Sequence, residues 1–108
     1  MIMNDKLKII LTELRQALES LYGDRLSRLI LFGSQARGDA MPDSDIDIMI
    51  VLKTDPEQQQ EDRRVTEVTA PLNLKHEVVI CCITVPEARF FSENTPFLRN
   101  VRREGHVL

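Results

Sequence analysis

The feature that most constrains the fold is a pair of short apolar runs separated by a loop that begins with glycine. Residues 29–32 read Leu-Ile-Leu-Phe, and residues 48–52 read Ile-Met-Ile-Val-Leu. Runs of this length bounded by turn residues are typical of buried strands. Gly33 directly follows the first run and permits a tight turn. The sequence therefore predicts a strand, a glycine turn and a second strand, with helices covering them.

Two carboxylates mark the start of the second predicted strand, residues 46–52, in the sequence Ser44-Asp45-Ile46-Asp47. Side chains at positions i and i+2 of a strand point to the same face, with Cα atoms roughly 6.6 Å apart. Asp45 and Asp47 can therefore lean together and hold metal ions spaced about 3.5–4 Å apart. Ile46 would then point to the opposite face, into a core.

The loop that starts at Gly33 contains the residue types that phosphate binding requires. Glycine lets the backbone approach a ligand closely, and Ser34 offers a hydroxyl and an N–H at the start of a short helical turn. Arg37 adds a forked donor that suits phosphate oxygens. Taken alone, these residues could form a plain strand-to-helix turn, with the two aspartates as turn caps. The order of loop, arginine, paired aspartates and apolar strand favours nucleotide chemistry instead.

Together these residues form one motif, Gly33-Ser34-x-Ala36-Arg37-Gly38 and then Ser44-Asp45-Ile46-Asp47. The motif resembles the signature of the polymerase-β-type nucleotidyltransferases, in particular their small stand-alone members, the minimal nucleotidyltransferases. The resemblance implies that Gly33 and Ser34 contact a triphosphate, with Arg37 adding positive charge. It also implies that Asp45 and Asp47 hold Mg²⁺, and that AMP is transferred from ATP or a closely related nucleotide to a hydroxyl group.

The same resemblance implies a third acidic residue on a later strand, which completes the metal site and helps to deprotonate the acceptor hydroxyl. Residues 76–85 form the third predicted strand, and Glu77 is its one acidic side chain. We therefore expect Glu77 to join Asp45 and Asp47 as a metal ligand and as the proton acceptor. The alternative is an ordinary solvated glutamate at the edge of the sheet.

The rest of the pattern predicts two long helices and a short C-terminal one. Apolar residues at helical spacing predict a helix over residues 4–22. A second helix is predicted over residues 57–70, because Pro71 lacks a backbone donor and should end or kink it. Thr95 and Pro96 have the order of a helix cap and a first helical residue. The predicted fold class is α/β, a small mixed sheet of three or more strands flanked by helices mainly on one side, as in polymerase-β-like nucleotidyltransferases.

Length and composition limit the classes of function. A chain of 108 residues suits one domain, residues 1–108, without a second domain to build an acceptor pocket. Its net charge of −3 argues against duplex nucleic acid, because phosphate binding normally requires a basic surface. Cys81 and Cys82 are adjacent, and we expect small buried side chains rather than a disulfide. Residues 1–6 lack the apolar core of a signal peptide, so we expect a cytoplasmic protein.

A protein partner is therefore expected to carry the acceptor hydroxyl. Relatives of this size resemble antitoxins encoded beside HEPN-type toxins, which are small helical ribonucleases. The resemblance implies that AMP goes onto a tyrosine of such a toxin. Two alternatives stay open. The chain could neutralise or scaffold a partner by contact alone, in which case Glu77 would lie away from the aspartates. It could also modify a small molecule, with a homodimer supplying the acceptor pocket.

Overall fold

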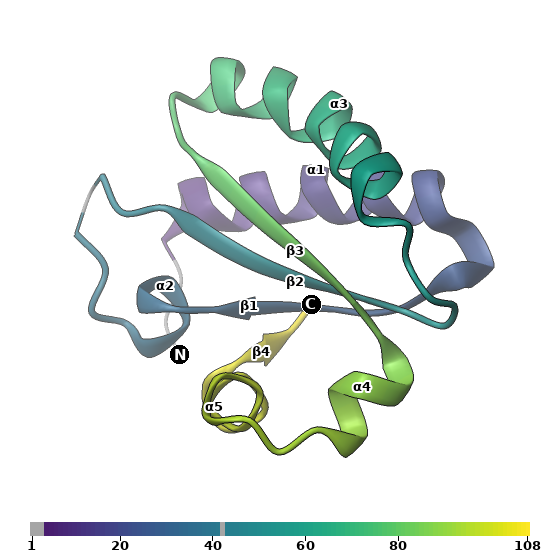
Figure 1. The fold of residues 1–108 in the computed structure, drawn as a ribbon. Helices are drawn as coiled ribbons and strands as arrows, with labels where there is room; N and C mark the ends of the chain where they lie inside the picture. The colour runs from purple at the N-terminus through teal and green to yellow at the C-terminus, as the bar shows by residue number, and fades with distance from the viewer. Residues whose placement is uncertain (1–3, 42) are drawn as a thin grey trace.

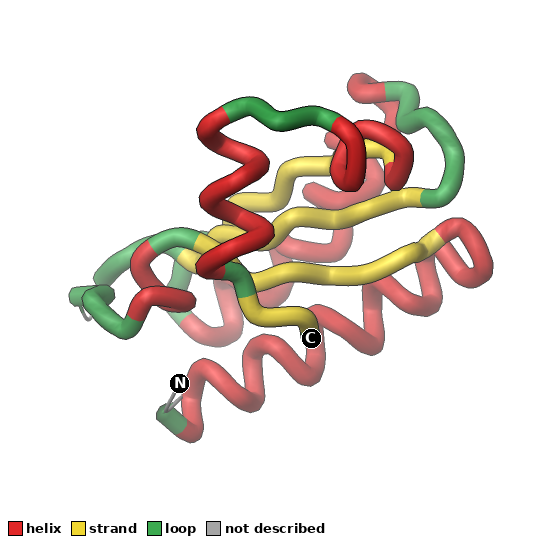
Figure 2. The backbone as a smooth tube through the Cα atoms, turned by 90° about the horizontal axis from the view of Figure 1, so that it is seen from below, coloured by secondary structure: helices red, strands yellow, loops and turns green. Residues whose placement is uncertain are grey.

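The structure, a computed structural model, describes residues 4–41 and 43–108. A four-stranded sheet in the order β3-β2-β1-β4 lies at its centre, with helices on both faces (Figures 1 and 2). The elements in chain order are α1 (Asp5–Tyr22), η1 (Gly23–Arg25), β1 (Leu26–Phe32), α2 (Ser34–Arg37), β2 (Ile46–Leu52), α3 (Gln58–His76), β3 (Ile80–Pro86), α4 (Glu87–Ser92), α5 (Pro96–Glu104) and β4 (His106–Val107). Residues 1–3, part of the segment without a signal-peptide core, lie outside the described residues.

The sheet is mixed. Strand β1 pairs antiparallel with both β2 and β4, whereas β2 pairs in parallel with β3. The long helix α3 makes the parallel connection from β2 to β3, because parallel neighbours need a crossover that returns the chain to the same end. The predicted fold class, a small mixed sheet flanked by helices, is confirmed.

The larger core lies between the sheet and the helices α1 and α3. Asn4 caps α1, its Oδ1 atom accepting a hydrogen bond of 2.7 Å from the N–H of Leu7. From Leu7 onward the helix buries one stripe of side chains, which explains why its helical period was visible in the sequence. The fully buried members of this core include Leu14, Leu18, Leu31, Ile48, Ile50 and Leu52.

A second, smaller core lies on the opposite face of the sheet, under α4 and α5. The side chains that form it are Ile30, Met49, Val51, Val85, Phe90, Leu98 and Val101. Thr95 caps α5 as predicted, its hydroxyl accepting a hydrogen bond of 3.2 Å from the N–H of Leu98. The two long helices thus lie on one face, as expected, and the shorter C-terminal helices α4 and α5 cover the other face.

Helix α3 does not end at Pro71, as the sequence predicted, but continues to His76. Proline inside a helix removes one backbone hydrogen bond, but the helix can continue beyond it. Beyond it, Leu72 packs against the larger core, and the His76 ring lies 3.0 Å from a carboxylate oxygen of Glu13 on α1. These contacts offset the missing hydrogen bond. The third strand consequently begins at Ile80, four residues later than predicted.

Within the described residues, none of the helices is both long enough and apolar enough to cross a membrane.

Candidate active site

The glycine turn after β1 forms the first half of the site. Gly33 has a φ of 74°, a conformation that favours glycine, and its carbonyl accepts hydrogen bonds of 3.1 Å from the N–H groups of Ala36 and Arg37. At the far end the N–H of Gly38 donates to the carbonyl of Ser34 at 3.0 Å. The short helical turn predicted over these residues is therefore present, with Ser34 as its first residue.

Gly33 lies directly against the carboxylate of Asp47. Strands β1 and β2 pair Phe32 with Asp47, which brings the next residue of the turn beside that side chain. A Cβ atom on residue 33 would stand 2.3 Å from Oδ2 of Asp47, closer than such atoms can approach. Only glycine therefore leaves the carboxylate where it is. The glycine turn and the acidic strand meet in direct contact.

Asp45 and Asp47 form the second half of the site. Asp45 immediately precedes β2 and Asp47 is its second residue, while Ile46 and Ile48 are buried under α1 and α3. Because side chains alternate along a strand, Asp47 points to the opposite face, where α5 lies. Burial raises the pKa of Asp47, the nearby charge of Asp45 raises it further, and the charge of Arg37 partly opposes this rise.

The two carboxylates fit a divalent cation. When ionised they only accept hydrogen bonds, and they lie close enough for the charge of Asp45 to raise the pKa of Asp47. Mg²⁺ prefers oxygen ligands and commonly binds through one or two carboxylates together with phosphate oxygens of the substrate. Asp45 and Asp47 are therefore the residues that would hold this ion.

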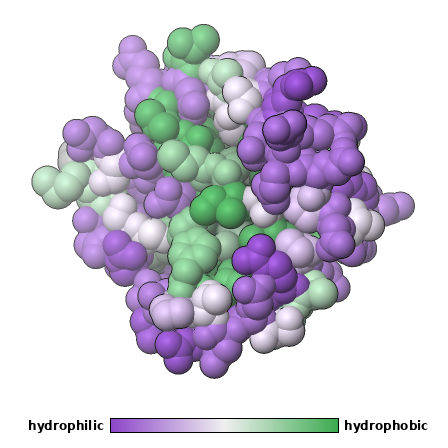
Figure 3. All heavy atoms as spheres, viewed as in Figure 1, coloured by the Kyte–Doolittle hydropathy of each residue, from purple (hydrophilic) through white to green (hydrophobic). Residues whose placement is uncertain are grey.

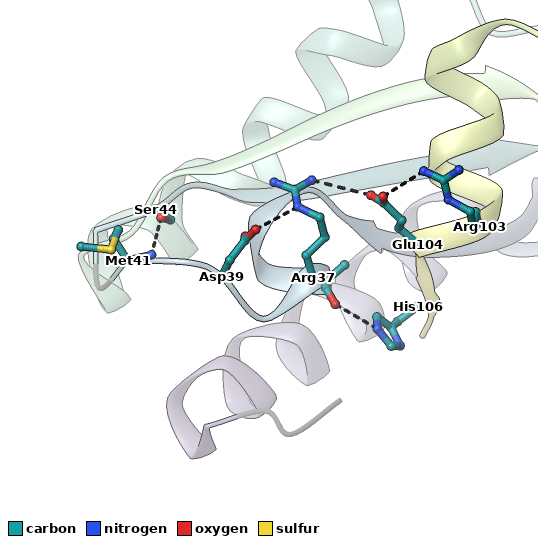
Figure 4. A network of polar contacts seen from close by, with 8 residues as sticks. Arg37, Asp39, Met41, Ser44, Arg103, Glu104 and His106 are labelled. Carbon is teal, nitrogen blue, oxygen red and sulfur yellow. Dashed lines mark hydrogen bonds and ion pairs between the residues drawn. The ribbon is translucent and has the colours of Figure 1, made fainter.

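Ser44 and Gln35 hold the loop between α2 and β2 in place. The Ser44 hydroxyl accepts a hydrogen bond of 2.8 Å from the N–H of Met41 (Figure 4), and its carbonyl accepts one of 3.3 Å from Nε2 of Gln35. The sequence motif included Ser44, but it gave no reason to single out Gln35. Both residues connect the segment that carries Asp45 to the glycine turn.

Arg37 connects the turn to the C-terminal helix. Its guanidinium forms ion pairs with Asp39 at 3.2 Å and with Glu104 of α5 at 3.7 Å (Figure 4). The ring of His106, in β4, lies 3.1 Å from the carbonyl of Ala36. Sequence analysis missed Glu104 and His106, because only the folded chain brings the C-terminus to α2.

The structure does not place Glu77 with the two aspartates. Glu77 is an exposed residue that ends α3 with a φ of 54°, so the expectation that it lies in the third strand was wrong. The residue of β3 in register with Asp47 is Cys81, and its thiol lies 3.7 Å from Oδ2 of Asp45. Across residues 4–41 and 43–108, no three histidine, cysteine, aspartate or glutamate side chains are grouped so that they could hold a metal ion together.

Comparison with known proteins identifies the family. The family model for the nucleotidyltransferase domain matches residues 11–106. The chain belongs to the nucleotidyltransferase domain family. This nucleotidyltransferase is 43% identical over 97 residues to "Putative protein adenylyltransferase MJ0604" of Methanocaldococcus jannaschii, covering 89% of this chain and 91% of that protein. It is 34% identical over 71 residues to "Putative protein adenylyltransferase MJ0141" of the same organism, covering 66% of this chain and 71% of that protein.

Solved structures share the nucleotidyltransferase fold. One described as a putative minimal nucleotidyltransferase matches with a TM-score of 0.62 at 20% identity, covering 94% of this chain and 95% of that chain. A chain from a crystal structure of a toxin–antitoxin with AMP-PNP matches with a TM-score of 0.61 at 20% identity, covering 96% of this chain and 72% of that chain. The family-model match and the curated relative, rather than these structures, confirm the prediction of a nucleotidyltransferase enzyme.

Proposed function

We propose that this nucleotidyltransferase transfers AMP from ATP to a hydroxyl group of a protein partner and uses Mg²⁺. The contact between Gly33 and Asp47 carries the proposal, because it puts the glycine turn and the carboxylate pair at one place. The names of the relatives in Methanocaldococcus jannaschii support protein adenylylation. The AMP-PNP in the matching toxin–antitoxin structure supports an adenine nucleotide.

Each residue of the site has a defined role in this proposal. The phosphates of ATP lie over Gly33 and Ser34, and Arg37 contributes positive charge. Asp45 and Asp47 hold the metal ion, which would neutralise charge on the phosphate oxygens. The acceptor hydroxyl oxygen bonds to the α-phosphorus, the bond from that phosphorus to the bridging oxygen breaks, and pyrophosphate leaves. The hydroxyl proton is released to water.

The proposed acceptor is a tyrosine of a HEPN-type toxin made in the same cytoplasm. The fold match to a toxin–antitoxin chain supports a protein partner. The surface supports one as well: β3 lies at the edge of the sheet, where Val79 and Ile83 are exposed, and apolar side chains gather over the middle of this face (Figure 3). An exposed apolar band of this kind commonly marks a protein interface.

The test is intact-mass analysis of the candidate partner after co-expression with this chain, followed by incubation with Mg²⁺ and ATP. We expect a gain of one or more AMP units with the wild-type chain and no gain with Asp47→Ala. Asp55→Ala, which removes an exposed aspartate beyond the far end of β2, is the matched control and should retain transfer. Retained transfer by Asp47→Ala would contradict the metal-binding role of this residue.

A second candidate function is neutralisation of the partner by contact alone. The position of Glu77 favours it, because the site then has two carboxylates rather than the three that the resemblance implied. The same experiment separates the two functions. A stable complex without a gain in mass would establish binding without transfer.

A further inference from the structure

A pocket lies beside the glycine turn and is not used by the roles given above. Its volume is about 230 Å³, and the residues that line it include Phe32, Gly33 and Arg37 on one side and Phe97, Asn100 and Glu104 on the other. One wall is thus the turn assigned to the phosphates, and the opposite wall is helix α5. A ligand group in this pocket would be continuous with phosphates bound over Gly33.

Helix α5 has two distinct faces that explain the pocket. Leu98 and Val101 are buried in the smaller core and fix the helix to the sheet. Phe97, Asn100 and Glu104 follow the spacing i, i+3 and i+7, which places them along one stripe of a helix. Because the helix is held by its buried residues, this second stripe stands at a fixed position opposite the turn.

Phe97 gives the pocket an aromatic wall. Its ring meets that of Phe32 edge to face, with ring centroids 5.7 Å apart and an angle of 80° between the planes. The residue nevertheless remains 45% exposed. A large apolar side chain with this exposure, next to a phosphate loop, can gain free energy by stacking on a flat ring from the ligand.

Asn100 gives the pocket a hydrogen-bond donor. Its Oδ1 atom accepts a hydrogen bond of 3.0 Å from Nη2 of Arg103, which leaves the amide NH₂ group to donate. Purine rings carry N7, an acceptor nitrogen that pyrimidines lack and that suits such a donor. The pocket volume suits a single ring system. Pockets that enclose a whole drug-sized ligand measure about 300–1,000 Å³, which is larger than this one.

The pocket and the carboxylate pair share one face of the sheet. Phe32 and Asp47 are directly paired residues of antiparallel strands, so their side chains point to the same side. Arg37 belongs to both, because it lines the pocket and its charge opposes the rise in the pKa of Asp47. A nucleotide with its phosphates over the turn can therefore place its base against α5 without crossing the sheet.

We propose that this pocket binds the purine base of the nucleotide substrate, with the base stacked on Phe97 and a ring nitrogen accepting a hydrogen bond from Asn100. The inference rests on the proposed function for the position of the phosphates, and it names the class of nucleotide that the enzyme accepts. Phe97 and Asn100 are then residues that determine specificity and take no part in the phosphoryl chemistry.

The test is calorimetric titration of the full chain, in the presence of Mg²⁺, with ATP, CTP and inorganic tripolyphosphate. Phe97→Ala should weaken ATP binding about tenfold and change tripolyphosphate binding by less than about twofold, because only ATP carries a base. Asn100→Ala should reduce the preference for ATP over CTP. Phe97→Leu keeps apolar bulk against Phe32 without a flat ring, and it should show the same selective loss with less effect on folding.

The matched controls remove a side chain of the same type outside the pocket. Phe91→Ala deletes an exposed phenylalanine on α4, and Asn94→Ala deletes an exposed asparagine before α5; both should bind ATP as the wild type does. If tripolyphosphate and ATP bind and the Phe97 and Asn100 variants bind ATP unchanged, the base pocket is overturned and the proposed function stands. If the wild-type chain binds neither compound, both proposals fail together.

Discussion

Asp47 is the residue at which stability conflicts with the proposed chemistry. It is only partly exposed, lies against Gly33 and is two positions from another carboxylate. Burial and the charge of Asp45 raise its pKa, so the ionised form costs folding free energy in the metal-free protein. Proteins accept such costs at functional sites, where a ligand later offsets them. The position therefore has a measurable signature that a purely structural aspartate would lack.

Asp47→Asn is expected to raise the melting temperature of the metal-free chain at pH 7 by about 1–4 °C. A raised folded-state pKa means that the penalty is absent below the unfolded value of about 3.9, grows between the unfolded and the folded values, and is complete above the folded value. The gain should therefore disappear near pH 3. Thermal unfolding in EDTA at the two pH values measures both effects.

Added Mg²⁺ should then stabilise the wild-type chain more than Asp47→Asn, because a ligand that binds only the folded state raises its stability. Asp55→Asn serves as the control and should behave as the wild type in EDTA and in Mg²⁺. If the variant is no more stable than the wild type at pH 7, the ionised carboxylate costs no folding free energy. If the variant gains as much from Mg²⁺ as the wild type does, residue 47 is not a metal ligand.

Among the elements, those with a local signal could be predicted from the sequence and those set by packing could not. Helix α1 has a cap and an unbroken apolar stripe, and β2 is a continuous apolar run, so both were predicted within about one residue. Helix α3 was predicted to end at Pro71, because a local rule was applied where contacts to α1 decide. Strand β4 has two residues, too few for any periodicity.

The candidate site follows the same division. Gly33, Asp45 and Asp47 lie within one short stretch of chain, and their spacing alone predicted that they act together. The position of Cys81 beside Asp47 depends on the register between two parallel strands, which the sequence does not contain. The wall formed by Phe97 depends on where α5 docks, and no local pattern reports that.

An ion pair between the half-buried Arg25 and the buried Glu61 connects η1 to α3 and offers a test at the scale of the elements. Glu61 is 1% exposed and accepts a hydrogen bond of 2.8 Å from Nη2 of Arg25. Removing the arginine leaves a buried carboxylate without its nearest partner, so Arg25→Met should lower the free energy of unfolding by about 2 kcal/mol. Urea unfolding of the variant measures the loss.

The double variant Arg25→Met with Glu61→Met distinguishes the effect of an unpaired buried charge from the effect of lost side-chain packing. Replacing both charges by apolar side chains of similar size should restore much of the lost stability, since no buried charge remains. If Arg25→Met leaves the free energy of unfolding unchanged, the pair does not hold α3 in the way described. The same follows if the double variant loses more free energy of unfolding than Arg25→Met and Glu61→Met lose when added together.

At the scale of the whole molecule, the C-terminal segment closes the second face of the sheet and borders the candidate site. Helix α5 and β4 meet at Gly105, where the chain passes very close to β1. A Cβ atom on this residue would stand 2.4 Å from Cγ2 of Ile30 and 2.5 Å from the carbonyl oxygen of Val101. On either side of it, Glu104 contacts Arg37 and His106 contacts Ala36. One close contact thus positions both the pocket wall and the support of the turn.

Gly105→Val should therefore both destabilise the chain and weaken nucleotide binding, because the new side chain would clash with Ile30. Overpacking at such a site costs about 1–3 kcal/mol, and relief of the clash requires α5 to move away from β1. Binding of ATP should fall more than binding of tripolyphosphate, because the wall carrying Phe97 shifts while Gly33 and Asp47 stay on the sheet. Gly23→Ala, at a positive φ of 54° with open space around it, is a destabilising control remote from the site. It should bind ATP as the wild type does, and equal losses in the two variants would mean that general instability, not the position of α5, weakens binding.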